Sequence, residues 1–143
     1  MTFDEVAALQ KDMLKAQAGA KLRSSAAGMY QFLGPEAERL RKKLGLKGSD
    51  RFTAGVQDMM AREILDEEGY GDFLAGKIDG KTFQKEIAPK WASIALPGTG
   101  MSHHGQPVGT ATDEMQAVLA AAKADAERAI TEQKADPYQQ RWR

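Results

Sequence analysis

The chain has 143 residues, 42% hydrophobic and 28% charged, which is the composition of a globular protein with one core. Twenty basic and twenty acidic residues give a net charge of zero. This balance argues against binding to nucleic acid or to a membrane surface through overall charge. The absence of cysteine excludes disulfides, thiol catalysis and thiolate metal sites.

No stretch of about 20 apolar residues is present, so we expect no membrane-spanning helix. The first residues, Met1 to Glu5, lack the basic start and apolar core of a signal peptide. We therefore expect no signal peptide.

The first half of the chain predicts three helical regions. Residues 2–17 carry apolar residues at a helical period: Phe3, Val6, Leu9, Met13 and Leu14. A second region covers residues 28–44 and is bent or restarted at Gly34-Pro35, because proline suits a first turn better than an interior. Thr53 is a good N-cap for a third helix that ends near residue 68, with an inner face of Val56, Met59, Met60 and Ile64.

The second half predicts shorter pieces and one long helix. Asp79 or Thr82 starts a helix with Phe83, Ile87 and Trp91 on one face, and Pro89 should kink or divide it. Residues 96–109 form a loop rich in glycine and proline. A last helix over residues 111–133 has an apolar stripe of Met115, Val118, Leu119, Ala122, Ala126 and Ile130. The expected architecture is all-α, with one domain over residues 1–135 and an extension over residues 136–143.

The most informative motif is Ser25-Ala26-Ala27-Gly28-Met29-Tyr30-Gln31. It resembles the Ser-x-Ala-Gly-x-Tyr-Gln segment of phage endolysins with a lysozyme fold, the lambda-type lytic transglycosylases. Three further segments resemble the same family in the same order: Phe52 to Asp58, Trp91 to Gly98, and Gly105-Gln106. The resemblance as a whole covers roughly residues 12–122, and it implies a lysozyme-like helical domain.

The chain departs from this family at two places. Aligning Asp12-Met13-Leu14 with the family's first helix puts Ala18-Gly19 where the family has its catalytic Glu-Gly. Only residues 20–24 then join the first helix to the motif, where the family has a β-hairpin lobe that walls the saccharide cleft. The resemblance thus implies a lysozyme-like helical domain that lacks the lobe and the general acid.

Loss of the acid removes the group that performs the reaction. Glycosidic cleavage needs a carboxylic acid within hydrogen-bond reach of the leaving oxygen, and the methyl group of Ala18 can neither donate nor accept a proton. Asp12 lies roughly 9 Å earlier along the helix axis. We therefore expect no catalytic residue. If the protein is active, the candidate acids are Asp12, Glu5 and Glu36, or an acid from another chain.

Four residues belong to the saccharide groove by resemblance: Ser25, Tyr30, Gln31 and Gln106. From the residues alone, structural roles are favoured for three of them. Tyr30 would pack in the core with its hydroxyl bonded, and Gln31 would brace a loop. Ser25 would cap a helix rather than act as a nucleophile.

Structural roles are also favoured for the two histidines and for Trp91. His103 and His104 are adjacent and point in different directions, so an exposed loop is favoured over a metal site. Trp91 is expected to be a core anchor because it shares a face with Phe83 and Ile87. We expect no metal and no cofactor.

The extension at residues 136–143 contains Tyr138, Arg141, Trp142 and Arg143, and tyrosine, tryptophan and arginine dominate binding hot spots. We expect it to contact a protein partner. The sequence thus favours a non-catalytic, lysozyme-derived structural or interaction protein of a phage particle or phage-like assembly. Its partners would be other subunits, and its location the virion, or the host cytoplasm before assembly. Two alternatives stay open: an active muramidase or lytic transglycosylase, and a module that binds peptidoglycan without turnover.

Overall fold

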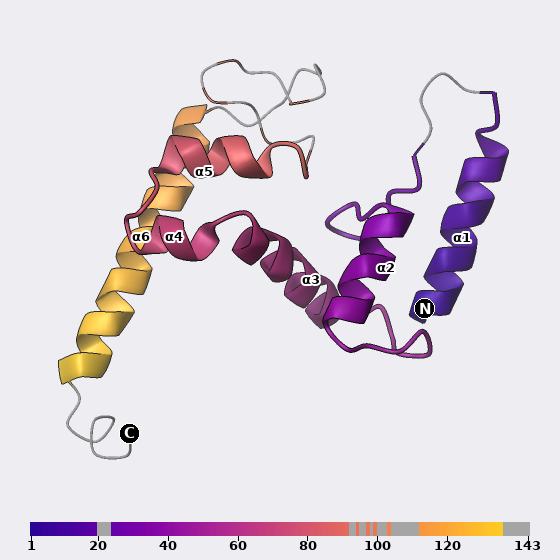
Figure 1. The fold of residues 1–143 in the computed structure, drawn as a ribbon, viewed down its shortest axis with the longest axis horizontal. Helices are drawn as coiled ribbons and strands as arrows, with labels where there is room; N and C mark the ends of the chain where they lie inside the picture. Colours follow the sequence, from indigo (N-terminus) through magenta and orange to yellow (C-terminus); the bar gives the residue numbers. More distant parts are fainter. Residues whose placement is uncertain are drawn as a thin grey trace. The chain divides into compact units, whose positions relative to one another are not determined.

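The structure is a computed structural model that describes residues 1–19, 24–91, 94, 97, 99, 103 and 112–135. The described residues form helices and no strand (Figure 1): α1 (Phe3–Ala16), α2 (Gly34–Lys43), α3 (Ala54–Glu67), α4 (Tyr70–Leu74), α5 (Gly80–Ile87) and α6 (Thr112–Ala135). Isolated bridges join Thr2 to Arg51 and Ala27 to Phe32. The all-α prediction is confirmed.

Backbone contacts divide the chain into unit 1, Met1–Leu65, and unit 2, Asp66–Arg143. The single domain over residues 1–135 stays a prediction. Residues 136–143 lie outside the described part of the chain. Within that described part, no helix is long and apolar enough to cross a membrane.

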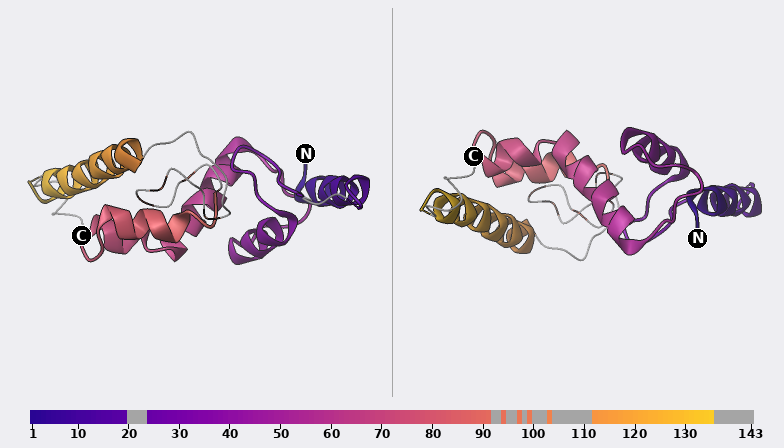
Figure 2. Two further views of the ribbon diagram at one scale, coloured as in Figure 1. Left: turned by 90° about the horizontal axis from the view of Figure 1, so that it is seen from above. Right: turned by 90° about the horizontal axis from the view of Figure 1, so that it is seen from below.

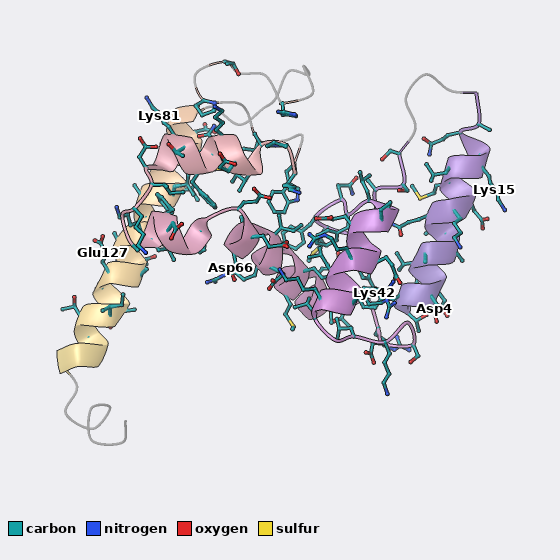
Figure 3. All side chains as sticks on the ribbon, viewed as in Figure 1. Asp4, Lys15, Lys42, Asp66, Lys81 and Glu127 are labelled. Carbon is teal, nitrogen blue, oxygen red and sulfur yellow. The ribbon has the colours of Figure 1, made fainter. Side chains whose placement is uncertain are left out.

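Helix α1 begins with a capping box. The Thr2 hydroxyl accepts from the Glu5 N–H at 3.2 Å, and the Glu5 carboxylate accepts from the Thr2 N–H at 2.9 Å. Asp4 in the first turn and Lys15 in the last complement the helix dipole, and Figure 3 labels both near the two ends of α1. These local signals explain why the predicted helix over residues 2–17 is confirmed almost to the residue.

The core of unit 1 is aromatic and aliphatic. The centroid of the Phe52 ring lies 5.3 Å from that of Phe3 and 6.3 Å from that of Phe32, and both pairs are edge to face. The other buried apolar side chains of unit 1 are Val6, Ala37, Leu40, Met60, Ala61 and Ile64. Helices α1 and α2 pack against each other in this unit.

Two predictions for unit 1 were wrong in part. The second helix begins at Gly34 and not near residue 28, because residues 28–31 form a turn closed by the Ala27–Phe32 bridge. Helix α3 begins after Thr53 as predicted, and the Thr53 hydroxyl accepts from the Val56 N–H at 3.2 Å. Its buried face, however, contains Gln57 rather than Met59, which is 51% exposed.

The basic residues of α2 are largely paired. Arg39 binds Glu36, Arg41 and Lys42 bind Glu38, and Lys43 reaches Glu63 of α3 at 2.9 Å. Exposed pairs of this kind contribute little to stability. They do neutralise the run of basic side chains on this helix.

Unit 2 is built around stacked aromatic rings. The rings of Phe73 on α4 and Phe83 on α5 stack at 5.4 Å, and Tyr70 lies 5.6 Å from Phe83. Both short helices pack against α6 (Figure 1 and Figure 2), where Leu119 is buried. Gln84 is buried as well, and its side-chain oxygen accepts a hydrogen bond from Gln116 of α6 at 2.8 Å.

Two predictions for unit 2 also need correction. Helix α5 ends at Ile87, two residues before Pro89, so half-buried Trp91 does not continue its apolar face. The long last helix is present, but Val118 is 64% and Ile130 53% exposed. Figure 1 shows the carboxyl-terminal part of α6 extending beyond α4 and α5.

Asp79 is the N-cap of α5, and this cap should make stability depend on pH. The backbone hydrogen bond from Thr82, together with the Thr82 hydroxyl and the nearby Lys81, lowers the pKa of Asp79 below its ordinary 3.8. A lowered folded-state pKa contributes stability above the unfolded value, and this contribution is lost as the pH falls through the folded value.

We therefore expect Asp79→Ala to lower the melting temperature at neutral pH. The difference from wild type should shrink below pH 3.8, as followed by circular dichroism. Glu86→Ala, an exposed acid on the same helix away from its cap, serves as the control. An Asp79→Ala difference that persists unchanged in acid would show that the cap charge plays no part.

Candidate functional site

The motif segment, residues 24–34, forms a tight turn in unit 1. Ala27 and Phe32 exchange two backbone hydrogen bonds of 2.9 Å, and the chain reverses between them. Gly28 has a φ of 81°, and a Cβ there would collide with the side chains of Gln57 and Phe52. Only glycine fits this close approach, which explains the glycine of the motif.

A buried amide holds both ends of this turn. Gln10 of α1 is 3% exposed, and its side-chain Nε2 donates to the carbonyls of Ser25 at 2.8 Å and Phe32 at 3.0 Å. The two carbonyls lie 15 and 22 residues away in sequence from Gln10. Gln10 therefore ties α1 to the motif segment.

A second glutamine holds the tip of the turn. Oε1 of Gln57, on α3, accepts from the Met29 N–H at 2.8 Å. Gln57 is 8% exposed, so this bond is shielded from water. The motif segment is thus held from two helices at once.

Ser25 caps α2 from a distance. Its hydroxyl accepts from the N–H of Gly34, the first residue of α2, at 3.0 Å. Ser25 thus binds the first N–H of the helix, but it lies nine residues before it and the N-cap residue is Leu33.

Tyr30 and Gln31 lie on the outer side of the turn, so Tyr30 is half-buried and does not pack in the core as predicted. The Tyr30 hydroxyl donates to the exposed Asp58 carboxylate at 2.6 Å, and its ring lies 5.9 Å from Phe32. This hydrogen bond raises the pKa of Tyr30, and burial and the negative charge of Asp58 act in the same direction. The Gln31 side chain donates to the Gly28 carbonyl at 2.9 Å, so it braces the loop as its residue type predicted.

Gln31 is also the one residue other than glycine with a positive φ, 54°, among those the structure describes. That conformation costs on the order of 1 kcal/mol for such a side chain.

Ala18 is exposed in the turn that follows α1. Next to it, Gln17 forms two hydrogen bonds with the backbone of Ser24, donating to its carbonyl and accepting from its N–H, each at 2.9 Å. The side-chain amide thereby closes the loop between α1 and the motif. By resemblance, this is the loop that stands where the family has a β-hairpin lobe.

The candidate acids do not converge on Ala18. Glu5 belongs to the capping box at the opposite end of α1, about 16 Å along the axis from Ala16. Both carboxylate oxygens of Glu36 accept from Arg39, at 3.0 and 2.8 Å. Asp12 is exposed on α1.

Several predicted positions lie outside the described residues: Gln106, His104, Tyr138, Arg141, Trp142 and Arg143. Their roles stay predictions. His103 is exposed, and in the described part of the chain no three His, Asp or Glu side chains are grouped to hold a metal ion.

Sequence reasoning did not assign Gln10, Gln17, Gln57 or Asp58 to the site. A signal existed for Gln10, since it interrupts the apolar face of α1 four residues after Val6. Gln57 and Asp58 belong to a segment that already resembled the endolysin family. Gln17 carries no signal, because its partner is a backbone group.

The helical architecture and the motif turn define an all-α protein with an endolysin-like motif. A protein-family model for Endolysin matches residues 4–126. The chain belongs to the endolysin family, as the motif predicted. Comparisons with curated proteins and with solved structures gave no match.

The buried amide of Gln10 gives a stability test of the site. Gln10→Met preserves the volume and removes the donor, which leaves the buried Ser25 carbonyl without its hydrogen bond. We expect a loss of about 1–3 kcal/mol in the free energy of unfolding, measured with a chemical denaturant. Leu9→Met, at the exposed neighbouring position, should change it by less than about 0.5 kcal/mol. Equal effects of the two substitutions would contradict the role of Gln10.

Proposed function

We propose that this endolysin-family chain does not cleave peptidoglycan and serves as a structural or interaction component of a phage particle or phage-like assembly. The observation that carries the proposal is the methyl side chain of Ala18, where the motif alignment puts the general acid. Without a proton donor, the leaving oxygen of a glycosidic bond is not protonated. General acid catalysis is worth about 10²–10⁴-fold in rate.

The positions of the three candidate acids support the same conclusion. Glu5 and Glu36 are already engaged, one in a helix cap and the other in a paired contact with arginine. Asp12 is a shorter acid, and it is exposed on the body of α1.

The loop after α1 is too short to supply a second feature that catalysis requires, the wall of the saccharide cleft. Only residues 20–23 separate Gly19 from Ser24, which is too few for the two strands and the turn of a hairpin, since each strand usually takes 3 to 10 residues. The two hydrogen bonds between Gln17 and Ser24 close this loop. A cleft without that wall would hold the sugar poorly, and positioning contributes as much to catalysis as the acid does.

The partner-binding part of the proposal rests on the extension at residues 136–143. Tyr138, Trp142 and two arginines are grouped there, and these residue types supply most hot-spot energy in protein interfaces. The proposed partners are other subunits of the assembly. The protein would then be found in the virion, and in the host cytoplasm before assembly.

A zymogram tests the catalytic part. Purified protein on a peptidoglycan gel should give no clearing above an inert protein, with an active lysozyme as the positive control. Ala18→Glu should also give no clearing, because the acid alone does not restore the missing wall of the cleft. The matched control Ala16→Glu places the same carboxyl group at the end of α1.

Clearing by wild type that disappears in Asp12→Ala, Glu5→Ala or Glu36→Ala would establish an active enzyme and end the proposal. Clearing by Ala18→Glu but not by Ala16→Glu would show that the cleft is intact and that only the acid is absent.

Mass spectrometry of purified particles tests the structural part. We expect the chain at a constant ratio to the other particle proteins after density-gradient purification. Deleting residues 136–143 should remove it from the particles while its helix content in circular dichroism stays unchanged. Absence of the intact chain from particles would contradict the structural role.

A further inference from the structure

One apolar face of α6 runs from a buried residue to an exposed one. Helices α4 and α5 contact α6, and Leu119 on that helix is buried. Ile130 follows Leu119 by 11 residues, about three turns and 20°, so the two side chains lie on one face of the helix. Ile130 is nevertheless 53% exposed, and Ala126, one turn before it, is half-buried. The exposed end of α6, residues 126–132, thus presents apolar surface to solvent (Figure 1).

An acidic side chain flanks this surface. Glu127, labelled in Figure 3, lies three residues before Ile130, which makes the two side chains neighbours on the helix. Glu127 is exposed, and in the described part of the chain its carboxylate forms no ion pair. Asp125, by contrast, is paired with Arg128. The exposed end of α6 therefore suits a segment that brings an apolar group and a positive charge.

The sequence favours a helix end directly after α6. The helix ends at Ala135, and Pro137 follows two residues later. Proline does not continue a helix, and it disfavours helical backbone at the residue before it. The extension at residues 136–143 is therefore not expected to prolong α6. It contains a tyrosine, a tryptophan and two arginines, which are the apolar and basic groups that the exposed end of α6 suits.

The length of the extension matches the distance back to Ile130. Extended backbone advances about 3.3 Å per residue, against 1.5 Å in a helix. A segment that turns at Pro137 and runs back along α6 would therefore bring Trp142 about 13 Å from Tyr138, the rise of about nine helical residues. That distance places Trp142 level with the stretch of α6 between Ala126 and Ile130.

We propose that residues 136–143 dock on the exposed end of their own α6, with Trp142 over Ile130 and an arginine beside Glu127. In extended backbone alternate side chains share a face, so both aromatic side chains of the extension can meet the helix while its two arginines stay at the edge. The indole covers apolar surface, and the charge pair at the edge favours one orientation of the segment.

Docking within one chain makes so small a surface sufficient. One isoleucine and one carboxylate would hold a separate peptide only weakly. A segment joined directly to α6 is present at an effective concentration on the order of millimolar, so a weak contact is populated. The inference goes beyond the proposed function, because it concerns the chain before any partner binds. A particle subunit that takes the extension would first have to release it from α6.

Fluorescence quenching of the isolated chain tests the docking. The chain has two tryptophans, so Trp91→Phe leaves Trp142 as the only one. We expect acrylamide to quench Trp142 in this variant at least about twofold less than in the synthetic peptide of residues 136–143, because a docked indole is shielded. Circular dichroism should show unchanged helix content. The indole signal of Trp142 in nuclear magnetic resonance spectra of wild type gives the same comparison without the Trp91 substitution.

Substitutions on α6 identify the surface. Ile130→Ser should raise the quenching of Trp142 to the level of the free peptide. The matched control Val118→Ser removes an aliphatic side chain that is 64% exposed on the same helix but about 120° away from Ile130 around its axis, and it should change nothing. Glu127→Lys should also raise the quenching, whereas Glu114→Lys, at an exposed acid on another face of α6, should not.

Three results would overturn the proposal. The first is quenching of Trp142 in the chain that equals quenching in the free peptide. The second is an equal effect of Ile130→Ser and Val118→Ser. The third is shielding of Trp142 that appears only as the protein concentration is raised, which would assign the exposed end of α6 to the extension of a second copy.

Discussion

The side-chain amide of Gln10 binds two backbone carbonyls that belong to opposite ends of one turn, those of Ser25 and Phe32. A buried carbonyl without a donor destabilises a protein by about 1–3 kcal/mol, so this contact constrains where α1 and the motif segment lie. Gln57 adds a bond at the tip of the turn. The cap of α2 by Ser25 depends on this placement, because Ser25 reaches Gly34 only when the turn is held in register.

The motif of the endolysin family therefore has a structural function here that does not require catalysis. Gly28 allows close approach to Gln57, and Gln31 braces the turn from outside. Tyr30 holds Asp58 at the surface. These contacts would be kept in a protein that had lost the general acid, and this explains how the motif and Ala18 occur in one chain.

Local signals in the sequence predicted the helices well, and distant contacts could not be predicted. Thr53 and Asp79 bind N–H groups three residues away, so their caps follow from the sequence alone. The buried face of α3 was predicted from hydrophobicity, which favoured Met59 over Gln57. Gln57 is buried because its side chain binds Met29, 28 residues earlier, and the periodicity of a helix cannot predict such a distant contact.

The pair of hydrogen bonds between Gln17 and Ser24 has an evolutionary consequence. These bonds join the end of α1 to the start of the motif segment, whatever the length of the loop between them. The entropic cost of closing a loop grows only slowly with its length. Segments of very different size can therefore be exchanged at this junction while the rest of unit 1 keeps its fold.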